Sequence, residues 1–374
     1  MRNLIKITAI LLILSLLSFC SREQTEIVMP KPITFEKNQK QLIDADNRLG
    51  FDIYRNILKK EDQRNILLSP LGLNKLLSLL SYGTKDNYRI KRMLNLPKLA
   101  DGAFLGEINT LNKTLFQLDD FCKFTTSDMF VLHDLNGIND TFSKFFRENK
   151  GFKLQNNSLN YLSSNTLGVK SFDVQNDIYL KCNFKYQTGT TESPFYLNPN
   201  ESKFVEMLIC ESDFNYYSDN ILKAVEIPIG RGNFNALVIM PETGQTVESL
   251  KSKFNSYYLK AINNRFRKLN LSVYMPQLDI DYTCSFTENM QKTVFNRTLN
   301  NLAFEKINDK KLFLHDFLQS VKLKTISKPG SNGMVSSKKP NSSIFIDRPF
   351  LFLITEKYSG SLVFIGQIAN PTSN

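Results

Sequence analysis

The chain has 374 residues, of which 42% are apolar and 29 are phenylalanine, so it can fill a substantial hydrophobic core. Its formal net charge is +11, but the basic residues are dispersed and form no run of about five or more like charges. This composition excludes an intrinsically disordered chain, and the absence of the aromatic and basic motifs of RNA-binding modules excludes a nucleic-acid partner.

Residues 1–20 have the pattern of a secretory signal peptide. Arg2 and Lys6 precede the apolar run Ile7–Phe19, and small residues lead up to a cleavage site before Ser21. A membrane anchor needs about 18 or more consecutive apolar residues, which this run does not reach. The alternative is a bacterial lipoprotein signal that ends at Cys20, although a bulky phenylalanine precedes this cysteine. The sequence therefore predicts a secreted, extracellular protein with no membrane contact in its mature form.

Residues 21–40 are polar, contain two prolines and are expected to form a loose N-terminal lead-in. Residues 41–374 are expected to form a single domain. From Gln41 the apolar residues recur at intervals of three and four, which predicts a helix that ends near Leu58.

A short buried run and a second helix meet at Ser69 and Pro70. Serine is a good helix N-cap and proline fits the first helical turn, so the start of this helix is well specified, and Gly83 can end it. The apolar pattern predicts further helices over 85–96, 140–149, 246–254 and 285–295.

From about Asp173 the apolar pattern changes to a period near 2, which is typical of strands. The expected strands are 176–184, 204–210, 222–229, 235–241, 269–278, 349–354 and 361–368. The last two are continuous apolar runs and indicate a buried antiparallel pair. Helices in the first part and strands in the second favour an α+β fold with a large antiparallel sheet.

The histidines and cysteines of the chain form no motif that is typical of an enzyme. The two histidines, His133 and His315, have no second metal ligand at helical or turn spacing. Four cysteines remain after the leader and match no metal motif: Cys122, Cys182, Cys210 and Cys284. One or two disulfides are compatible with them, but the pairing cannot be assigned from sequence. The sequence thus predicts no enzymatic activity, no metal and no cofactor.

Seven Asn-x-Ser/Thr sequons make the chain a candidate glycoprotein, which suits an exported protein. They are Asn112, Asn139, Asn156, Asn200, Asn270, Asn296 and Asn341. Because the chain is rich in asparagine, several of them can arise by chance.

Four segments, in chain order, resemble the serpin family of serine protease inhibitors. They are "NILLSPLGLNKLLSLLSYGTKDN" (65–87), "NDIYLKCNF" (176–184), "LKAVEIPI…NALVIMP" (222–241) and "DRPFLFLI…GSLVFIGQIANP" (347–371). The resemblance runs from about Leu42 to the C-terminus and is most specific in the last segment. It implies one monomeric domain with three β-sheets, of which the largest is a central antiparallel sheet, about eight or nine helices, and an exposed reactive loop over about 327–343.

The resemblance also implies inhibition of a serine protease that takes this loop as a suicide substrate. The protease cleaves the loop, whose front half then inserts as a new strand of the central sheet and distorts the bound protease. The family's hinge falls on Lys328, Pro329, Gly330 and Ser331.

Lys338 and Lys339 are the basic residues in the outer half of the loop, which implies a trypsin-like protease with an acidic specificity pocket. Lys338 is the favoured bait, because the bond between Lys339 and Pro340 would resist such enzymes. The alternative is that the two lysines only solvate an exposed loop.

Departures from the family pattern favour a second interpretation, a non-inhibitory binding or carrier protein. Pro329 cannot donate a ladder hydrogen bond, and Gly330–Lys339 would span only about 33 Å as a strand. Phe184 stands where the family has a tryptophan. The chain between Phe152 and Asn176 is too short for the helix that crosses the family's central sheet.

Arg265, Arg267 and Lys268 form a small basic group that could bind a sulfated polysaccharide or a membrane surface, as similar groups do in some serpins. The alternative is a strand edge protected by charge. Asp347 and Arg348 are expected to orient the chain ahead of a buried strand.

Overall fold

The computed structural model describes residues 28–58, 64–96, 103–132, 137–148, 152–156, 170–251, 254–289, 293–308, 312–327 and 340–372. Its helices are α2 (Lys37–Leu58), α3 (Pro70–Gly83), α4 (Asn87–Met93), α5 (Ala103–Phe116), α6 (Asp140–Glu148), α7 (Val247–Lys251), α8 (Ser256–Asn263), α9 (Phe286–Asn289) and α10 (Val294–Asn300). No described helix is long and apolar enough to cross a membrane.

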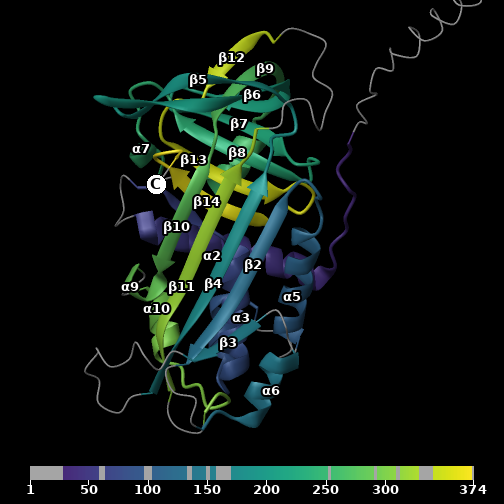
Figure 1. Cartoon of the computed structure of the whole chain (residues 1–374), viewed down its shortest axis with the longest axis vertical. Helices are drawn as coiled ribbons and strands as arrows, with labels where there is room; N and C mark the ends of the chain where they lie inside the picture. Colours follow the sequence, from purple (N-terminus) through teal and green to yellow (C-terminus); the bar gives the residue numbers. More distant parts are fainter. Residues whose placement is uncertain are drawn as a thin grey trace, which may run out of the picture.

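The strands are β1 (Ile66–Leu68), β2 (Lys123–Leu132), β3 (Phe152–Asn156), β4 (Lys170–Cys182), β5 (Gln187–Asn198), β6 (Glu201–Ser218), β7 (Leu222–Ile229), β8 (Phe234–Pro241), β9 (Arg267–Pro276), β10 (Asp279–Ser285), β11 (Leu312–Thr325), β12 (Ser342–Phe345), β13 (Phe350–Glu356) and β14 (Leu362–Ile368). Together with the helices they give the expected α+β fold (Figure 1).

The central sheet has five strands in the order β10-β11-β4-β2-β3. The pairs β10·β11 and β2·β4 are antiparallel, whereas β4·β11 and β2·β3 are parallel. The expected antiparallel central sheet is therefore mixed. A parallel pair needs a long connection, and the chain between β4 and β11 builds most of the remaining strands before it returns.

The other nine described strands are connected through β6, which takes part in two sheets. The first contains β5, β6, β9 and β12, and the second contains the end of β6 with β7, β8, β13, β14 and β1. Residues 201–216 of β6 pair with β5 and β9, and residues 215–218 pair with β7. The first sheet lies across the top of the molecule in Figure 1, and the second lies behind the central sheet. With the central sheet, these two sheets give the expected three-sheet arrangement.

The two C-terminal strands confirm the expected buried pair. β13 and β14 pair antiparallel, every residue of β14 is buried, and all of β13 except Thr355 is buried. Helix α3 packs between β14 and β4 of the central sheet, and α2 packs against β14 and α3, so the core is continuous from one sheet to the other.

Helix α3 begins as the sequence predicts. Ser69 is its N-cap, with the side-chain Oγ accepting from the N–H of Gly72, and Pro70 occupies the first helical turn. The expected helix over 285–295 is instead two short helices, α9 and α10, and the expected helix over 85–96 is limited to α4.

The N-terminal helix begins at Lys37, four residues before the expected Gln41. Phe35 ahead of it is buried in the core, and Lys31 exchanges two hydrogen bonds with Asn233. These contacts hold the described part of the lead-in against the domain, so the expectation of a loose lead-in up to residue 40 is corrected for residues 31–40.

Candidate functional site

The seam between β4 and β11 lies in the middle of the central sheet (Figure 1). The two strands pair in parallel from Lys170 opposite Leu312 to Cys182 opposite Thr325, with one irregularity next to Leu314. Their backbone groups therefore satisfy one another directly, and no other strand lies between them. We use "seam" below for these paired residues.

Both ends of the expected reactive loop are attached close to the sheets. After β11, the N–H of Ile326 donates to the carbonyl of Cys182 (2.9 Å) and the Gln187 side chain donates to Ser327 Oγ (2.9 Å). At the far end, the N–H of Asn341 donates to the carbonyl of Asn270 (3.2 Å), just before β12 pairs in parallel with β9. The expected hinge and bait residues, Lys328, Pro329, Gly330, Ser331, Lys338 and Lys339, lie outside the described residues.

The direction of the seam strands determines how a further strand could fit. A chain that leaves β11 after Thr325 and turns back runs antiparallel to β11, and because β4 is parallel to β11 it is antiparallel to β4 as well. Inserting such a strand would replace one parallel ladder with two antiparallel ladders, which are slightly more stable per residue. The seam is thus a site where an added strand would gain backbone hydrogen bonds.

A buried side-chain network ties the two seam strands to α3. Gln319 of β11 donates to Asn176 Oδ1 of β4 (2.9 Å) and to the Ser69 carbonyl (3.0 Å), and its Oε1 accepts from the Ser69 N–H (2.9 Å). Gln319 and Asn176 stand opposite each other in the register of the ladder. All three residues are buried. A strand inserted at this level would have to break the hydrogen bond between Gln319 and Asn176.

The network continues to a buried ion pair below the sheet. Asn176 Nδ2 donates to Asp128 Oδ1 (2.7 Å), and Asp128 also pairs with Lys75 of α3. The Asp128 side chain is completely inaccessible. Burial raises the pKa of the Asp128 carboxyl, and the nearby Lys75 ammonium only partly offsets this effect. We call Ser69, Lys75, Asp128, Asn176 and Gln319 the seam network.

Gly72 allows α3 to approach the seam network closely. A Cβ atom at this position would lie 2.0 Å from Asn176 Oδ1 and 2.7 Å from Gln319 Nε2. Both atoms belong to side chains held by hydrogen bonds on either side of the seam. A glycine is therefore required if the helix and the two strands are to keep this spacing.

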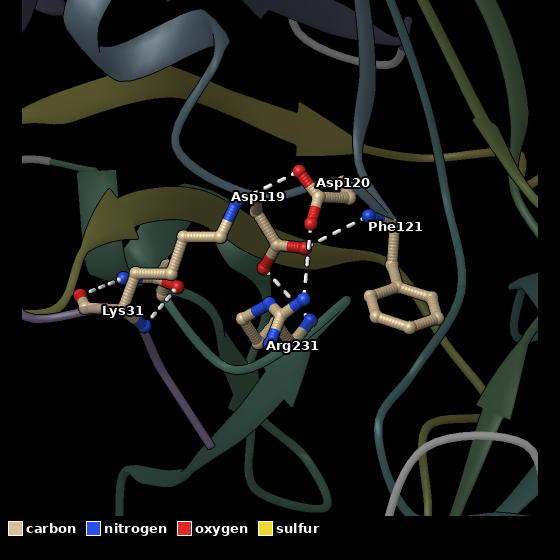
Figure 2. Close-up of polar contacts among 6 residues, drawn as sticks. Lys31, Asp119, Asp120, Phe121 and Arg231 are labelled. Carbon is tan, nitrogen blue, oxygen red and sulfur yellow. Dashed lines mark hydrogen bonds and ion pairs between the residues drawn. The ribbon is translucent and has the colours of Figure 1, made fainter. Parts of the chain in front are cut away.

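A second polar cluster, shown in Figure 2, includes the turn just before β2, and β2 begins beside the end of β4. Asp120 pairs with Lys31 Nζ (2.8 Å) and with Arg231 (2.9 Å). These hydrogen bonds, to Lys31 and then to Arg231, lower the pKa of the exposed Asp120 carboxyl. We call Lys31, Asp119, Asp120, Arg231 and Asn233 the clasp.

Asp119 joins two turns of the clasp. It accepts from the N–H of Phe121 (3.0 Å), in the turn between α5 and β2, and from the N–H of Arg231 (2.7 Å), in the turn between β7 and β8. Burial raises the pKa of the Asp119 carboxyl despite these hydrogen bonds. The charged groups of the clasp pair with one another and with the backbone of two turns. The clasp therefore has the features of a structural contact that holds the N-terminal segment against the domain.

The basic group is only partly available for a polyanion. Arg265 donates to the Tyr217 hydroxyl (3.1 Å) and lies over the Tyr217 ring, whereas the Arg267 and Lys268 side chains are exposed at the start of β9. These two residues pair with β6 and precede the part of β9 that pairs with β12, so this stretch is a sheet edge. Polysaccharide binding by this group stays a prediction.

The two histidines, the sequons and the expected position of the crossing helix add no further site among the described residues. His315 contacts Asp173 (2.9 Å) on the surface, His133 lies outside the described residues, and no cluster of metal-binding side chains occurs among the described residues. The sequon residues Asn112 and Asn296 are buried. Residues 157–169, where the family's crossing helix would lie, are outside the described residues.

Comparison with known proteins identifies the family of this chain. The sequence model described as serpin (serine protease inhibitor) matches residues 44–166 and 162–371. The chain belongs to the serpin family. In this serpin the expected reactive loop is attached at one end directly after β11, which is one of the two seam strands.

The curated relatives of this serpin have different named activities. Intracellular coagulation inhibitor 2 of Tachypleus tridentatus is 23% identical and the match covers 89% of this chain and 92% of the relative. Serpin H1 of Mus musculus is 24% identical, with 88% of each chain covered. Corticosteroid-binding globulin of Mus musculus is 20% identical, with 89% and 92% covered. Membership supports a function of the protease-inhibitor kind, although the family also has members that are named for binding.

Solved structures confirm the fold of this serpin. Mouse protein-Z dependent protease inhibitor superposes with a TM-score of 0.76 at 19% identity, covering 90% of this chain and 98% of that structure. Human glycosylated kallistatin gives a TM-score of 0.75 at 18% identity, covering 91% of this chain and 100% of that structure.

Proposed function

We propose that this serpin inhibits a trypsin-like serine protease as a suicide substrate, with residues 328–339 as the reactive segment and Lys338 as the recognised residue. The observation that carries the proposal is the directly paired parallel seam next to the attachment point of this segment. The segment connects to the end of β11, and a chain that turns back there has the direction that the seam accepts.

Cleavage after Lys338 would release the segment from its second attachment. The catalytic serine of the protease would become esterified to the Lys338 carbonyl, while the amine of Lys339 leaves with the C-terminal part that includes β12. The front part would remain joined to β11 through Ser327 and could insert between β4 and β11 with the protease attached. Insertion would break the Gln319–Asn176 hydrogen bond and form two antiparallel ladders.

A denaturing gel tests this proposal. The purified protein is incubated with a trypsin-like protease and boiled, and we expect a covalent complex with the mass of the protease plus the chain up to Lys338. Lys338→Ala should abolish the complex, and the matched Lys339→Ala should retain it. Complete cleavage after Lys338 with no boiling-resistant complex would refute inhibition by trapping.

The second candidate function is a non-inhibitory binding or carrier protein on the same scaffold. It is favoured by Pro329, which is the fourth residue after Thr325 and lacks the N–H that a strand at the start of the seam would donate. In this case protease cleaves the segment without being trapped. Pro329→Ala discriminates the two candidates, because it should create or increase complex formation if proline alone blocks insertion.

We also propose that the protein is exported as a monomer after removal of residues 1–20. The supporting observation is the pattern of basic residues, apolar run and small residues at the N-terminus. Expression of the full chain in secreting cells, followed by N-terminal sequencing of the exported protein, should identify Ser21 as the first residue. A lipid-modified Cys20 at the N-terminus would show the lipoprotein alternative instead.

A further inference from the structure

Cys122 and Cys182 are brought together by the pairing of β2 with β4. The two strands are antiparallel, and Lys123 stands opposite Lys181 at the end of their ladder. Cys122 directly precedes β2 and Cys182 is the last residue of β4, so continuing the register by one position sets the two opposite each other. Both side chains are buried, with exposed fractions of 3% and 1%.

Their spacing suits a covalent bond. Opposed residues of an antiparallel pair have Cα atoms about 4.5–5.5 Å apart, which lies within the range of about 4.4–6.8 Å that disulfides span. The two thiols are also close enough to share a hydrogen bond. The other cysteines differ, since Cys210 of β6 faces Val273 and Gln187, and Cys284 of β10 faces Gln319.

The clasp fixes the position of Cys122. The N–H of Cys122 donates to the Asp119 carbonyl (3.1 Å), and Asp119 in turn binds the N–H of Arg231. Gly230 has a φ of +57°, and a Cβ atom there would lie 2.6 Å from Cys122 Sγ. The turn between β7 and β8 thus closes one side of this thiol, while Cys182 lies across the ladder from it.

We propose that Cys122 and Cys182 form a structural disulfide when the protein folds in an oxidising compartment, and that Cys210 and Cys284 remain thiols. The oxidant is a small disulfide such as oxidised glutathione. The thiolate of one cysteine attacks it and releases one glutathione, and the second cysteine then displaces the other. One S–S bond is broken and one is formed, and the two thiol protons go to the two glutathione thiolates.

The bridge forms before the native packing is complete. The hydrogen bond to Cys182, together with burial, raises the pKa of the Cys122 thiol, so little thiolate is present in the folded protein at neutral pH. Oxidation of the folded, reduced protein is therefore slow and is accelerated by low concentrations of urea that open this end of the sheet.

The bridge leaves the seam free. Cys182 is the last seam residue of β4, but β2 lies on the side of β4 away from β11, so a bond between β2 and β4 does not link β4 to β11. Closing the chain between residues 122 and 182 restricts the unfolded state and raises the thermal midpoint. This proposal is independent of the inhibitory function, because the reduced and oxidised proteins are expected to behave alike towards a protease.

Peptide mapping and melting test the disulfide. The purified protein that begins at Ser21 and therefore lacks Cys20 is refolded in a glutathione redox buffer, free thiols are blocked with N-ethylmaleimide under denaturing conditions, and the protein is digested with trypsin. We expect peptide Thr114–Lys123 linked to peptide Cys182–Lys185, with Cys210 and Cys284 alkylated. The oxidised protein should melt about 5 °C or more above the reduced protein.

Melting of each variant in its oxidised and reduced forms provides the controls. The difference between the two forms should disappear in Cys122→Ala and in Cys182→Ala and persist in Cys210→Ala. Because each variant is compared with itself, a packing defect caused by the substitution does not affect the result. Alkylation of all four cysteines after refolding, or a bridge between another pair, would overturn the proposal.

Discussion

The seam network and the clasp both use an aspartate and a lysine to join distant segments, but their environments act in opposite directions. Asp128 of the seam network is fully buried, and burial raises the pKa of its carboxyl. Asp120 of the clasp is exposed, and its hydrogen bonds to Lys31 and Arg231 lower the pKa of its carboxyl. Breaking the buried pair of Asp128 should therefore lower the stability of the protein strongly, whereas breaking the solvated pair of Asp120 should lower it little.

The largest expected effect comes from Lys75→Met. The substitution leaves the Asp128 carboxylate buried without its cation, which costs about 3–5 kcal/mol of unfolding free energy. Urea unfolding at neutral pH measures this loss. Lys144→Met, which breaks an exposed pair with Glu148 on α6, is the matched control and should cost about 0.5 kcal/mol or less. Equal losses in the two variants would contradict the contrast between buried and exposed pairs.

Gly72→Ala should destabilise the protein by about 1–3 kcal/mol, because the added methyl group overlaps the Asn176 and Gln319 side chains. The control is Gly106→Ala in α5, where nothing lies within 4 Å of the added atom. Removing a helical glycine there should stabilise the protein by about 0.5–1 kcal/mol. Opposite signs in urea unfolding are expected, and a neutral Gly72→Ala would show that α3 is not held tightly against the seam.

The pH dependence of stability should reveal a third buried carboxyl, Asp46 of α2. Burial raises its pKa well above the ordinary value, and the hydrogen bond from Asn74 does not compensate. Asp46 Oδ2 is buried without a hydrogen-bond partner, which further disfavours the charged carboxylate. The folded state then holds the carboxyl proton more tightly than the unfolded state, and stability is lost as the pH rises through the raised pKa.

Asp46→Asn mimics the protonated form. Unfolding in urea at several values between about pH 4 and pH 8 should show a smaller loss of stability with rising pH than in the unsubstituted protein. Asp120→Asn is the opposing control, because a lowered pKa contributes stability that is lost as the pH falls. If Asp46→Asn leaves the pH profile unchanged, the Asp46 carboxyl does not take up a proton on folding.

The smallest expected effect is that of Lys31→Met in the clasp. Its ion pair with Asp120 is solvated, so the loss should stay below about 1 kcal/mol and disappear in about 1 M salt. Urea unfolding at low and high salt measures it. A loss as large as that of Lys75→Met would mean that the clasp, and not burial, holds the described lead-in in place.

Local signals in the sequence predicted local structure correctly. Ser69 and Pro70 place the start of α3 because a side-chain cap and a proline act within one helical turn. The apolar runs of β13 and β14 predicted buried strands because both faces of these strands are covered. The start of α2 was missed although a local contact marks it, because the Gln39 side chain accepts from the N–H of Glu36 directly before the helix (2.9 Å).

The candidate site could not be predicted from sequence, because its residues come together only through the pairing of strands that are distant in the chain. Asn176 and Gln319 stand at inward positions of strands whose other inward residues are mostly apolar, and this is the signal that could have marked them. Their mutual hydrogen bond exists only because β4 and β11 are neighbours in the sheet with these two residues in register. In the same way, the four cysteines gave no pairing until the β2·β4 ladder, which ends with Lys123 opposite Lys181, showed that Cys122 and Cys182 follow at the same end.

The thermal midpoint before and after cleavage within residues 328–339 tests the central claim most directly. If the released segment inserts between β4 and β11, the cleaved protein gains two antiparallel ladders and should melt tens of degrees above the intact protein. An unchanged midpoint after complete cleavage would contradict this account, because the seam would then have stayed closed to the segment.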